Sequence, residues 1–554
     1  MSAEPVKLAS RGLRGTVAPS LDDASPSFGA DDVTVLKFHG IYQQDDRDTR
    51  KARTRAGDAL DHSCMVRIGL PGGRLRSDQW LALDRVADVV GSESLRLTTR
   101  QGIQFHGIVK GHLRTLLRTI AARELSTFAA CGDVVRNVMA SPAPLPGAVA
   151  EEIHEVADRI ATHFRPATRA YVEIWLDDEP ALTVESTEHE PIYGTTYLPR
   201  KFKIGIASPG DNAVDVLTHD VGIVPVVADG RIERFTLAIG GGLGRSHQRP
   251  DTFPRLGSWF ADVEPDELIE VLEAIVVFQR DHGDRSDRKQ ARLKYVVERL
   301  GVDEVRRRVE DLLGRRLGAP SHHEFPATDD HLGWHRAADG SWFLGIHVPS
   351  GRIRDDAGRD HRSAVRTLAQ RFESDLRCTP QQNLLVCGID AADRRAVEQV
   401  LHDHGVPLVE QLRPLERAAL ACPALPTCGQ ALGEAERAMP EILATLDGVL
   451  DDLGLTGEPI QLRVTGCPNG CARPYVAELA LVGRTKTAYD LYLGGSHDGT
   501  RLNRAVRTSI RVGDLADELR PILRRWAAER RPGERLGDWA NRVGPDSLGP
   551  GTAS

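Results

Sequence analysis

Two segments of the chain share one order of hydrophobic and polar positions. Over residues 70–108 a Pro/Gly turn leads into a stretch with helical periodicity, and alternating strand-like positions follow. The same order returns over residues 348–389. Both copies open with the pattern P-x-G-R-[LI] and close with Gly-Ile. Chance similarity of two βαβ pieces is the alternative, but the matched openings and endings favour an internal duplication.

A weaker repeat follows each copy. Residues 169–244 predict a strand, a basic turn, further strands and a glycine-rich end, and residues 461–495 predict the same with a cysteine-rich turn. Charge-rich helical stretches at 265–315 and 431–453 would cover these sheets. The sequence therefore predicts an α/β (α+β) fold of two halves related by a pseudo-twofold, with a shared site between them.

Length and composition narrow the class of protein. The 554 residues are 41% hydrophobic and 27% charged, which excludes collagen-like, coiled-coil and wholly disordered chains. A net charge of −8 argues against a nucleic-acid partner. No apolar run approaches the roughly 20 residues of a membrane span, and the N-terminus lacks the apolar segment of a secretory signal. We expect a cytoplasmic protein with no membrane partner.

Four of the eight cysteines are clustered in the C-terminal part of the chain: Cys422, Cys428, Cys467 and Cys471. Structural zinc sites usually use short spacings in both pairs, and the five-residue gap in the first pair fits this poorly. The Pro-Asn-Gly turn of the second pair would let backbone approach a bulky inorganic group. An iron–sulfur cluster is favoured. A zinc site and unliganded core cysteines remain alternatives, and the other four cysteines are expected to be buried thiols.

Lysine is rare, with nine among 71 basic residues, yet Lys201 and Lys203 are only two positions apart. On a strand both would point to one face, where they repel each other unless they share an anion. A solvated surface strand is the alternative. Arg285, Arg288 and Arg292 have the spacing of one helical face. A small oxyanion and a multiply carboxylated cofactor would suit these residues together with Arg100, Arg136, Asn137, Arg169 and Arg200.

No segment predicts a nucleotide site. The run Gly240–Gly244 lacks the strand–G-x-G-x-x-G–helix context of a dinucleotide-binding loop. There is no Walker A pattern, and no flavin fingerprint is recognisable. If the chain carries out redox chemistry, its electrons are therefore expected to come from a partner protein.

Several motifs together resemble the sirohaem- and iron–sulfur-dependent sulfite and nitrite reductases. They are Thr98-Thr-Arg-Gln101, Gln104-Phe-His-Gly107, the segments 35–48 and 197–203, and Val464-Thr-Gly-Cys-Pro-Asn-Gly-Cys471. The resemblance extends from about residue 31 to 540. It implies a duplicated fold with ferredoxin-like half-domains, two larger sheet domains, and sirohaem between the halves. It also implies that the four clustered cysteines hold a [4Fe–4S] cluster, which Cys471 bridges to the sirohaem iron.

The resemblance further assigns roles to the basic residues. It implies that Arg100, Arg169, Lys201 and Lys203 grip sulfite during its six-electron reduction to sulfide, and that Arg136 lies beside the sirohaem. The expected electron donor is a flavoprotein reductase subunit or a ferredoxin. Nitrite reduction is the alternative. The family pattern has asparagine for nitrite and lysine for sulfite at the position of Lys203, so sulfite is favoured. A zinc-stabilised binding protein is a rival from another class.

The expected boundaries follow from the repeat and the resemblance. They are a disordered tail (1–30), an arm with the first ferredoxin-like half-domain (31–145), a first sirohaem/substrate domain (146–329), a second half-domain (330–415), an iron–sulfur/sirohaem domain (416–540) and a tail (541–554).

Overall fold

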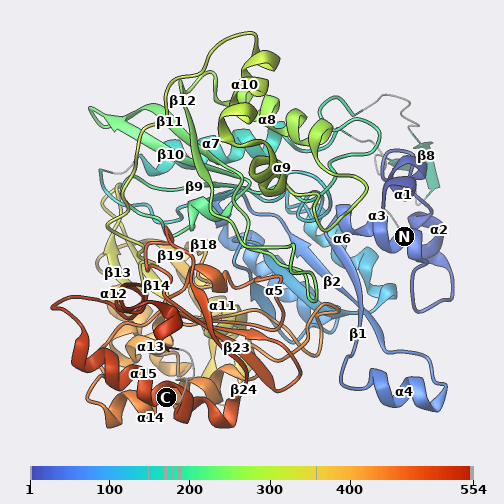
Figure 1. The fold of residues 1–554 in the computed structure, drawn as a ribbon. Coiled ribbons are helices and arrows are strands. Elements are labelled where there is room, and N and C mark those ends of the chain that lie inside the picture. The colour runs from blue at the N-terminus through green and yellow to red at the C-terminus, as the bar shows by residue number, and fades with distance from the viewer. Residues whose placement is uncertain are drawn as a thin grey trace.

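A computed structural model of the chain describes residues 3–147, 149–167, 173–176, 179–183, 190–356 and 358–548. Within these ranges the strands form four five-stranded sheets and two short two-stranded ones, β7–β8 (Glu173–Leu176, Glu179–Thr183) and β16–β17 (Asp355–Asp356, Arg359–Asp360). One large sheet is at the top of the view and another at the bottom, with the two half-domains between them (Figure 1). No described helix is long and apolar enough to cross a membrane.

The two half-domain sheets have the same strand order. The first pairs β1 (Ile41–Asp45), β2 (His62–Ile68), β5 (Ile103–Ile108) and β4 (Leu95–Leu97). The second pairs β13 (Gly333–Arg336), β14 (Trp342–Ile346), β19 (Leu384–Ile389) and β18 (Asp375–Cys378). Helices α5 (Ser77–Val89) and α11 (His361–Phe372) follow the repeated turn and pack on each other. The duplication predicted from the sequence is confirmed.

The halves interlock at the repeated P-x-G-R-[LI] pattern. Strand β3 (Arg74–Leu75) pairs with β18 of the second sheet, whereas β15 (Arg352–Ile353) pairs with β4 of the first. Gln101 and Gln382, equivalent in the two copies, both have a positive φ. The Gln101 Nε2 donates to Cys378 O in the other copy, and the Gln382 Nε2 donates to Leu97 O. Each half thus completes the edge of the other.

The two large sheets also have the same arrangement of strands. The first runs β12 (Ser258–Val263), β11 (Arg231–Ile239), β10 (Val221–Ala228), β9 (Ile204–Ile206) and β6 (Met139–Ala140). The second runs β24 (Arg504–Arg511), β23 (Ala488–Leu493), β22 (Leu479–Gly483), β21 (Leu462–Thr465) and β20 (Leu420–Ala421). In both sheets the last three strands of this order are parallel to one another. Each of the first two strands pairs antiparallel with the strand that follows it in the order. Strand β6 belongs to this sheet although it lies inside the predicted range 31–145.

Amphipathic helices cover the sheets. In the first half these are α6 (Leu113–Ala121), α7 (Ala150–His163), α8 (Leu268–His282), α9 (Leu293–Leu300) and α10 (Val302–Leu313). In the second half they are α12 (Arg394–Asp403), the short α13 (Pro414–Arg417), α14 (Met439–Asp452), α15 (Leu515–Glu529) and α16 (Leu536–Val543). Their apolar stripes are buried in the core and their charged faces meet solvent.

The prediction of a disordered tail over residues 1–30 is wrong for the described part. Helices α1 (Glu4–Ala9) and α2 (Val17–Asp22) precede α3 (Ala30–Leu36), and α4 (Arg50–Ala56) follows in the arm. Lys7 is 2% exposed and donates to Leu198 O at 2.9 Å. The buried contacts involve a few scattered side chains, which a polar composition does not reveal. At the other end, α16 and the 3-10 turn Pro545–Leu548 continue past residue 540.

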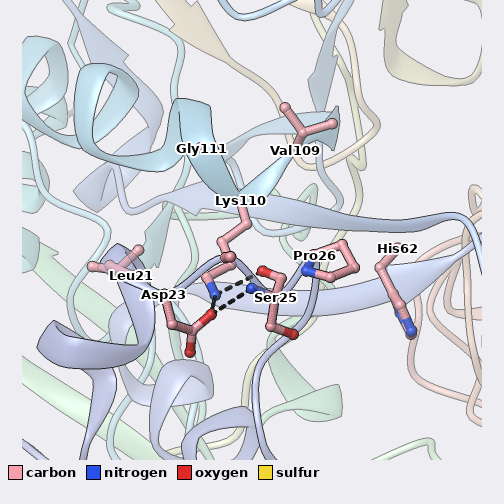
Figure 2. Close-up of a pocket in the computed structure, with 9 residues that line it drawn as sticks. Leu21, Asp23, Ser25, Pro26, His62, Val109, Lys110 and Gly111 are labelled. Carbon is pink, nitrogen blue, oxygen red and sulfur yellow. Dashed lines mark hydrogen bonds and ion pairs between the residues drawn. The ribbon is translucent and has the colours of Figure 1, made fainter.

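The N-terminal segment is also fastened at the loop before α6. Figure 2 shows Lys110 reaching Asp23 and Ser25 at the rim of a pocket of about 280 Å³. The Lys110 Nζ lies 2.5 Å from the Asp23 carboxylate and donates to Ser25 O at 2.9 Å. This pocket is lined by residues 21, 23–26, 62 and 109–111, none of which was predicted as a site residue.

An ion pair joins equivalent points of the two large sheets. Asp215 precedes the 3-10 turn Val216–Thr218 and Arg473 precedes the turn Pro474–Val476, both with positive φ. The Asp215 Oδ2 lies 2.9 Å from Arg463 Nη1 and 3.0 Å from Arg473 Nε. All three side chains are buried, so one carboxylate balances two guanidinium groups at the junction.

Replacing Asp215 with Asn is expected to destabilise the junction by about 3–5 kcal/mol, because two buried cations lose their counter-charge. Asn tolerates positive φ well, so the backbone is not the cause. The measurement is the apparent Tm of the purified protein. The control is Asp229→Asn, since Asp229 has the same φ of 51° but is exposed. Equal Tm values for the two variants would contradict the prediction.

Candidate functional site

The four clustered cysteines lie at one edge of the second large sheet. Cys422 follows β20, and the turn containing Cys467 and Cys471 follows β21, its parallel neighbour. Carboxyl ends of parallel strands meet at the same edge, so the two loops are brought together. The Gly466 N–H donates to Cys422 Sγ at 3.3 Å. A Cβ on Gly466 would lie 2.6 Å from Gly433 O, so only glycine allows this close approach.

The electrostatics of the thiols fit a cationic inorganic centre. Burial and the neighbouring cysteines raise the pKa of Cys422 to about 11, and they also raise the pKa of Cys428 and Cys467. As thiolates, these groups therefore need a strong positive partner. Among the described residues no three Cys, His, Asp or Glu side chains converge on a point suited to one metal ion. Soft thiolate ligands from four cysteines are the donor set that a [4Fe–4S] cluster requires.

Lys201 and Lys203 face away from the core. The intervening Phe202 is buried and forms a bridge with Val135, so the two lysines share the opposite side. Both are half-buried. Burial and the cations of Arg200 and Arg136 lower the pKa of Lys201. Burial, Arg100 and Arg292 do the same for Lys203.

This grouping of cations calls for an anion. Among the described residues, neither lysine ammonium donates a hydrogen bond to a protein acceptor. The Arg100 Nε is likewise buried without a partner. Like charges held together and left unpaired indicate a ligand that supplies the missing negative charge.

The Arg100 guanidinium is fixed to the backbone. Its Nη2 donates to Asn137 O at 2.6 Å and to Ile204 O at 3.1 Å. The Asn137 amide in turn donates to Leu70 O and Arg100 O, each at 2.8 Å. Both N–H groups of the Asn137 side chain are therefore used inside the protein, and this residue orients Arg100.

The cysteine edge and the cationic group lie together between the halves. The Thr99 hydroxyl, next to Arg100, donates to Cys471 O at 2.9 Å. The Arg245 N–H, next to the glycine run, donates to Pro468 O at 2.9 Å. Cys471 is also one of the groups that influence the pKa of Lys203. These contacts join residues of the first half to the cysteine turn of the second half.

The prediction that Arg285, Arg288 and Arg292 line one helical face is wrong. Helix α8 ends at His282 and α9 begins at Leu293. Between them the Asp284 carboxylate accepts the N–H groups of residues 286 and 287, a local bond that competes with a helix.

Each of these three arginines has an acidic partner. The Arg285 Nη1 lies 2.5 Å from a Glu4 carboxylate oxygen, and Arg288 pairs with Asp133 through two bonds of 2.7 and 2.9 Å. The Arg292 Nη2 lies 2.5 Å from Asp220. Arg292 is nevertheless one of the charges that act on both lysines. Arg169 lies outside the described residues.

Sequence reasoning missed two residues of the site. Asp220 is fully buried, pairs with Arg292 and accepts the Lys203 N–H at 3.0 Å. His219 contacts Arg100. In the sequence these two residues are visible only as an adjacent His-Asp pair just before the apolar strand β10. Nothing in the sequence indicates that this pair contacts residues 100 and 292. The fold alone brings them together.

Comparisons with known proteins agree with this architecture. The family model described as "Nitrite and sulphite reductase 4Fe-4S domain" matches residues 155–317 and 415–548. That of the "Nitrite/Sulfite reductase ferredoxin-like half domain" matches residues 59–123 and 335–404.

Curated relatives match over nearly the whole chain. The "Sulfite reductase [NADPH] hemoprotein beta-component" of Acidithiobacillus ferrooxidans is 45% identical over 97% of this chain and 95% of its own length. The protein of the same name from Chromohalobacter salexigens is 43% identical over 98% and 95%. The solved structure of the Mycobacterium tuberculosis NirA protein has the same fold, with a TM-score of 0.79, 23% identity, and coverage of 99% and 97%. The chain therefore belongs to the nitrite and sulphite reductase family.

Proposed function

We propose that this chain is the hemoprotein of a sulfite reductase of the assimilatory type, which reduces sulfite to sulfide. The observation that carries the proposal is the position of Arg100 and Lys203, which have no ion-pair partner among the described residues, close to the Cys471 turn that Thr99 contacts. An oxyanion bound there lies beside the redox centre. Curated relatives that are 41–45% identical are named sulfite reductase hemoproteins.

The residues present fit the two prosthetic groups of the family. Cys422, Cys428, Cys467 and Cys471 would hold the [4Fe–4S] cluster, and Cys471 would also be the cysteine nearest the sirohaem. When bound, sirohaem and the cluster supply the site that takes the sulfur atom and the six electrons. We assign the sirohaem carboxylates to Arg136 and Arg200, with Asn137 as support. Arg285, Arg288 and Arg292 already have carboxylate partners and brace the rim of the site.

The basic side chains have two different roles, which are to stabilise the anion and to donate protons. Sulfite is a dianion, and three S–O bonds break as oxygen leaves with protons as water. Arg100 keeps its charge and stabilises the anion throughout. Lys201 and Lys203 carry N–H groups beside the anion, so both can donate protons to departing oxygens. We give Arg169 the same anion-binding role as in the family pattern.

Sulfite is favoured over nitrite by charge. Nitrite is a smaller monoanion, and the two adjacent lysines with Arg100 offer more positive charge than it requires. Reduced thiolates and soluble electron donors are also typical of the cytoplasm, where we place the reaction.

Electrons are proposed to come from a separate flavoprotein reductase, in line with the printed name of the relatives. The run Gly240–Gly244 cannot serve as a nucleotide loop. It follows β11, and a Cβ on Gly241 would lie 2.2 Å from Leu217 O, so the run packs against protein.

The isolated holoprotein is therefore expected to produce sulfide from sulfite with reduced methyl viologen but not with NADPH. The viologen reaches metal centres without a docking partner, whereas NADPH needs a nucleotide site and a flavin. Sulfide is measured after anaerobic incubation with each donor. Sulfide formed from NADPH alone would contradict the proposed need for a partner.

A further inference from the structure

The segment 219–221 touches three of the basic residues of the site. His219 contacts Arg100, the Asp220 Oδ2 accepts from Lys203 N and Arg292, and the Val221 N–H donates to Lys203 O at 3.1 Å. We infer that His219 is a positioning residue: its imidazole accepts a hydrogen bond from Arg100 and thereby fixes the guanidinium for the substrate anion. This inference rests on the proposed role of Arg100 in binding sulfite.

The imidazole has a defined orientation. His219 is 3% exposed, and its Nε2 lies 3.1 Å from Val214 O. A carbonyl oxygen can only accept, so the proton is on Nε2 and Nδ1 is left as an acceptor. The ring also packs flat on Gly205, where an added Cβ would lie 2.8 Å from Nε2. A side chain at position 205 would clash with this ring, so glycine is required there.

The Arg100 Nη1 lies 3.4 Å from that free Nδ1. Burial and the cations of Arg100, Lys203 and Arg473 lower the pKa of His219 well below its ordinary value, so the ring stays neutral and able to accept. A protonated imidazole would instead repel the guanidinium. The neutral His219 thus holds the Arg100 guanidinium in place without neutralising its positive charge, as a carboxylate would.

Counting donors indicates which N–H groups of Arg100 remain for the anion. A guanidinium carries five N–H groups. Two on Nη2 are used by Asn137 O and Ile204 O, and one on Nη1 is used by His219. The Nε–H and the second Nη1–H are left, and the Nε is buried without a partner. Without His219 the Nη1 end is free to rotate away, while the backbone contacts of Nη2 persist.

The test compares His219→Leu with His219→Asn in the holoenzyme. The Oδ1 of Asn occupies the place of the imidazole Nδ1 and can accept from Arg100, whereas Leu has a similar size but no acceptor. The dissociation constant of sulfite is measured by calorimetry on the oxidised holoenzyme, with iron content and visible absorption as checks of cofactor loading. We expect Leu to weaken binding about tenfold, the usual effect of losing one hydrogen bond to a charged group, and Asn to stay within about threefold.

Two further variants separate the possible failures. His402→Asn, at an exposed position of α12, is the control for replacing a histidine. Arg100→Gln removes the guanidinium itself and is expected to weaken sulfite binding by about a hundredfold. Unchanged binding in that variant would refute the proposed role of Arg100. Weak binding in Arg100→Gln together with normal binding in His219→Leu would overturn the inference about His219 alone.

Equal weakening by Leu and Asn would also overturn it, since the effect would then come from packing of the ring. If His219→Leu fails to retain its iron, His219→Met takes its place, because an unbranched apolar chain adapts to the same space. Weaker sulfite binding by His219→Met than by His219→Asn would then support the inference, and equal weakening would overturn it.

Discussion

Replacing Cys467 with Ser is expected to remove the iron–sulfur cluster and, with it, sulfite reduction. Cys467 is buried at the start of the Pro-Asn-Gly turn, on the same sheet edge as Cys422. A serine hydroxyl binds iron far more weakly than a thiolate does. Iron and acid-labile sulfide are measured in the purified variant, with viologen-dependent sulfide formation as the activity. We expect loss of the cluster iron and at least a thousandfold lower turnover, roughly 4 kcal/mol.

The matched control is Cys387→Ser. Cys387 is equally buried but lies on β19 of the second half-domain, far from the cysteine edge in sequence and outside the cluster. That variant should keep its iron even if its stability falls. Retention of about four cluster irons plus the haem iron by the Cys467 variant would refute the assignment of the ligands.

The repeat was the most predictable part of the fold. The P-x-G-R-[LI] pattern and the alternation around it are local features, and local features persist in the sequence after duplication. The exchange of β3 and β15 between the half-domains was not predictable in this way. A two-residue strand carries no periodicity, and only tertiary contacts decide which sheet it joins.

The chemistry was predictable where the residue type is rare. Cysteines at short spacing and two lysines in a lysine-poor chain stand out, and the structure places the Cys471 turn against Thr99, next to Arg100. Individual arginines do not stand out, because most of the basic residues of the chain are arginines. The spacing of Arg285, Arg288 and Arg292 suggested a helix, but the Asp284 carboxylate accepts the N–H groups of residues 286 and 287 and forms a local turn instead.

The partners of Arg100, Lys203 and Arg292 could not be predicted from the sequence. Asp220 and His219 act through contacts with residues 72 to 119 positions away. A buried carboxylate or imidazole has no sequence signature of its own, because its role depends on which charges the fold places beside it. Such residues become visible only when the donors and acceptors of the site are counted.

Replacing Lys203 with Asn is expected to reduce kcat/KM for sulfite by about 30- to several-thousand-fold, the range for removing one partner of a buried charge-assisted contact. The loss for nitrite should be smaller. Burial and the cations of Arg100 and Arg292 hold the pKa of Lys203 low in the free protein. A bound dianion reverses that shift, and a monoanion does so only in part, so sulfite gains more from the lysine than nitrite does.

Both substrates are assayed with reduced viologen, so that the electron donor is the same in each case. Lys289→Asn is the matched control, since Lys289 is exposed in the turn between α8 and α9. Iron content and visible absorption must equal those of the unmodified protein, because a variant that has lost its cofactors says nothing about the anion. A small and equal loss for sulfite and nitrite would place Lys203 outside the substrate contacts. A large loss for sulfite with a modest one for nitrite would make the charge of this single side chain the main basis on which the site distinguishes the two anions.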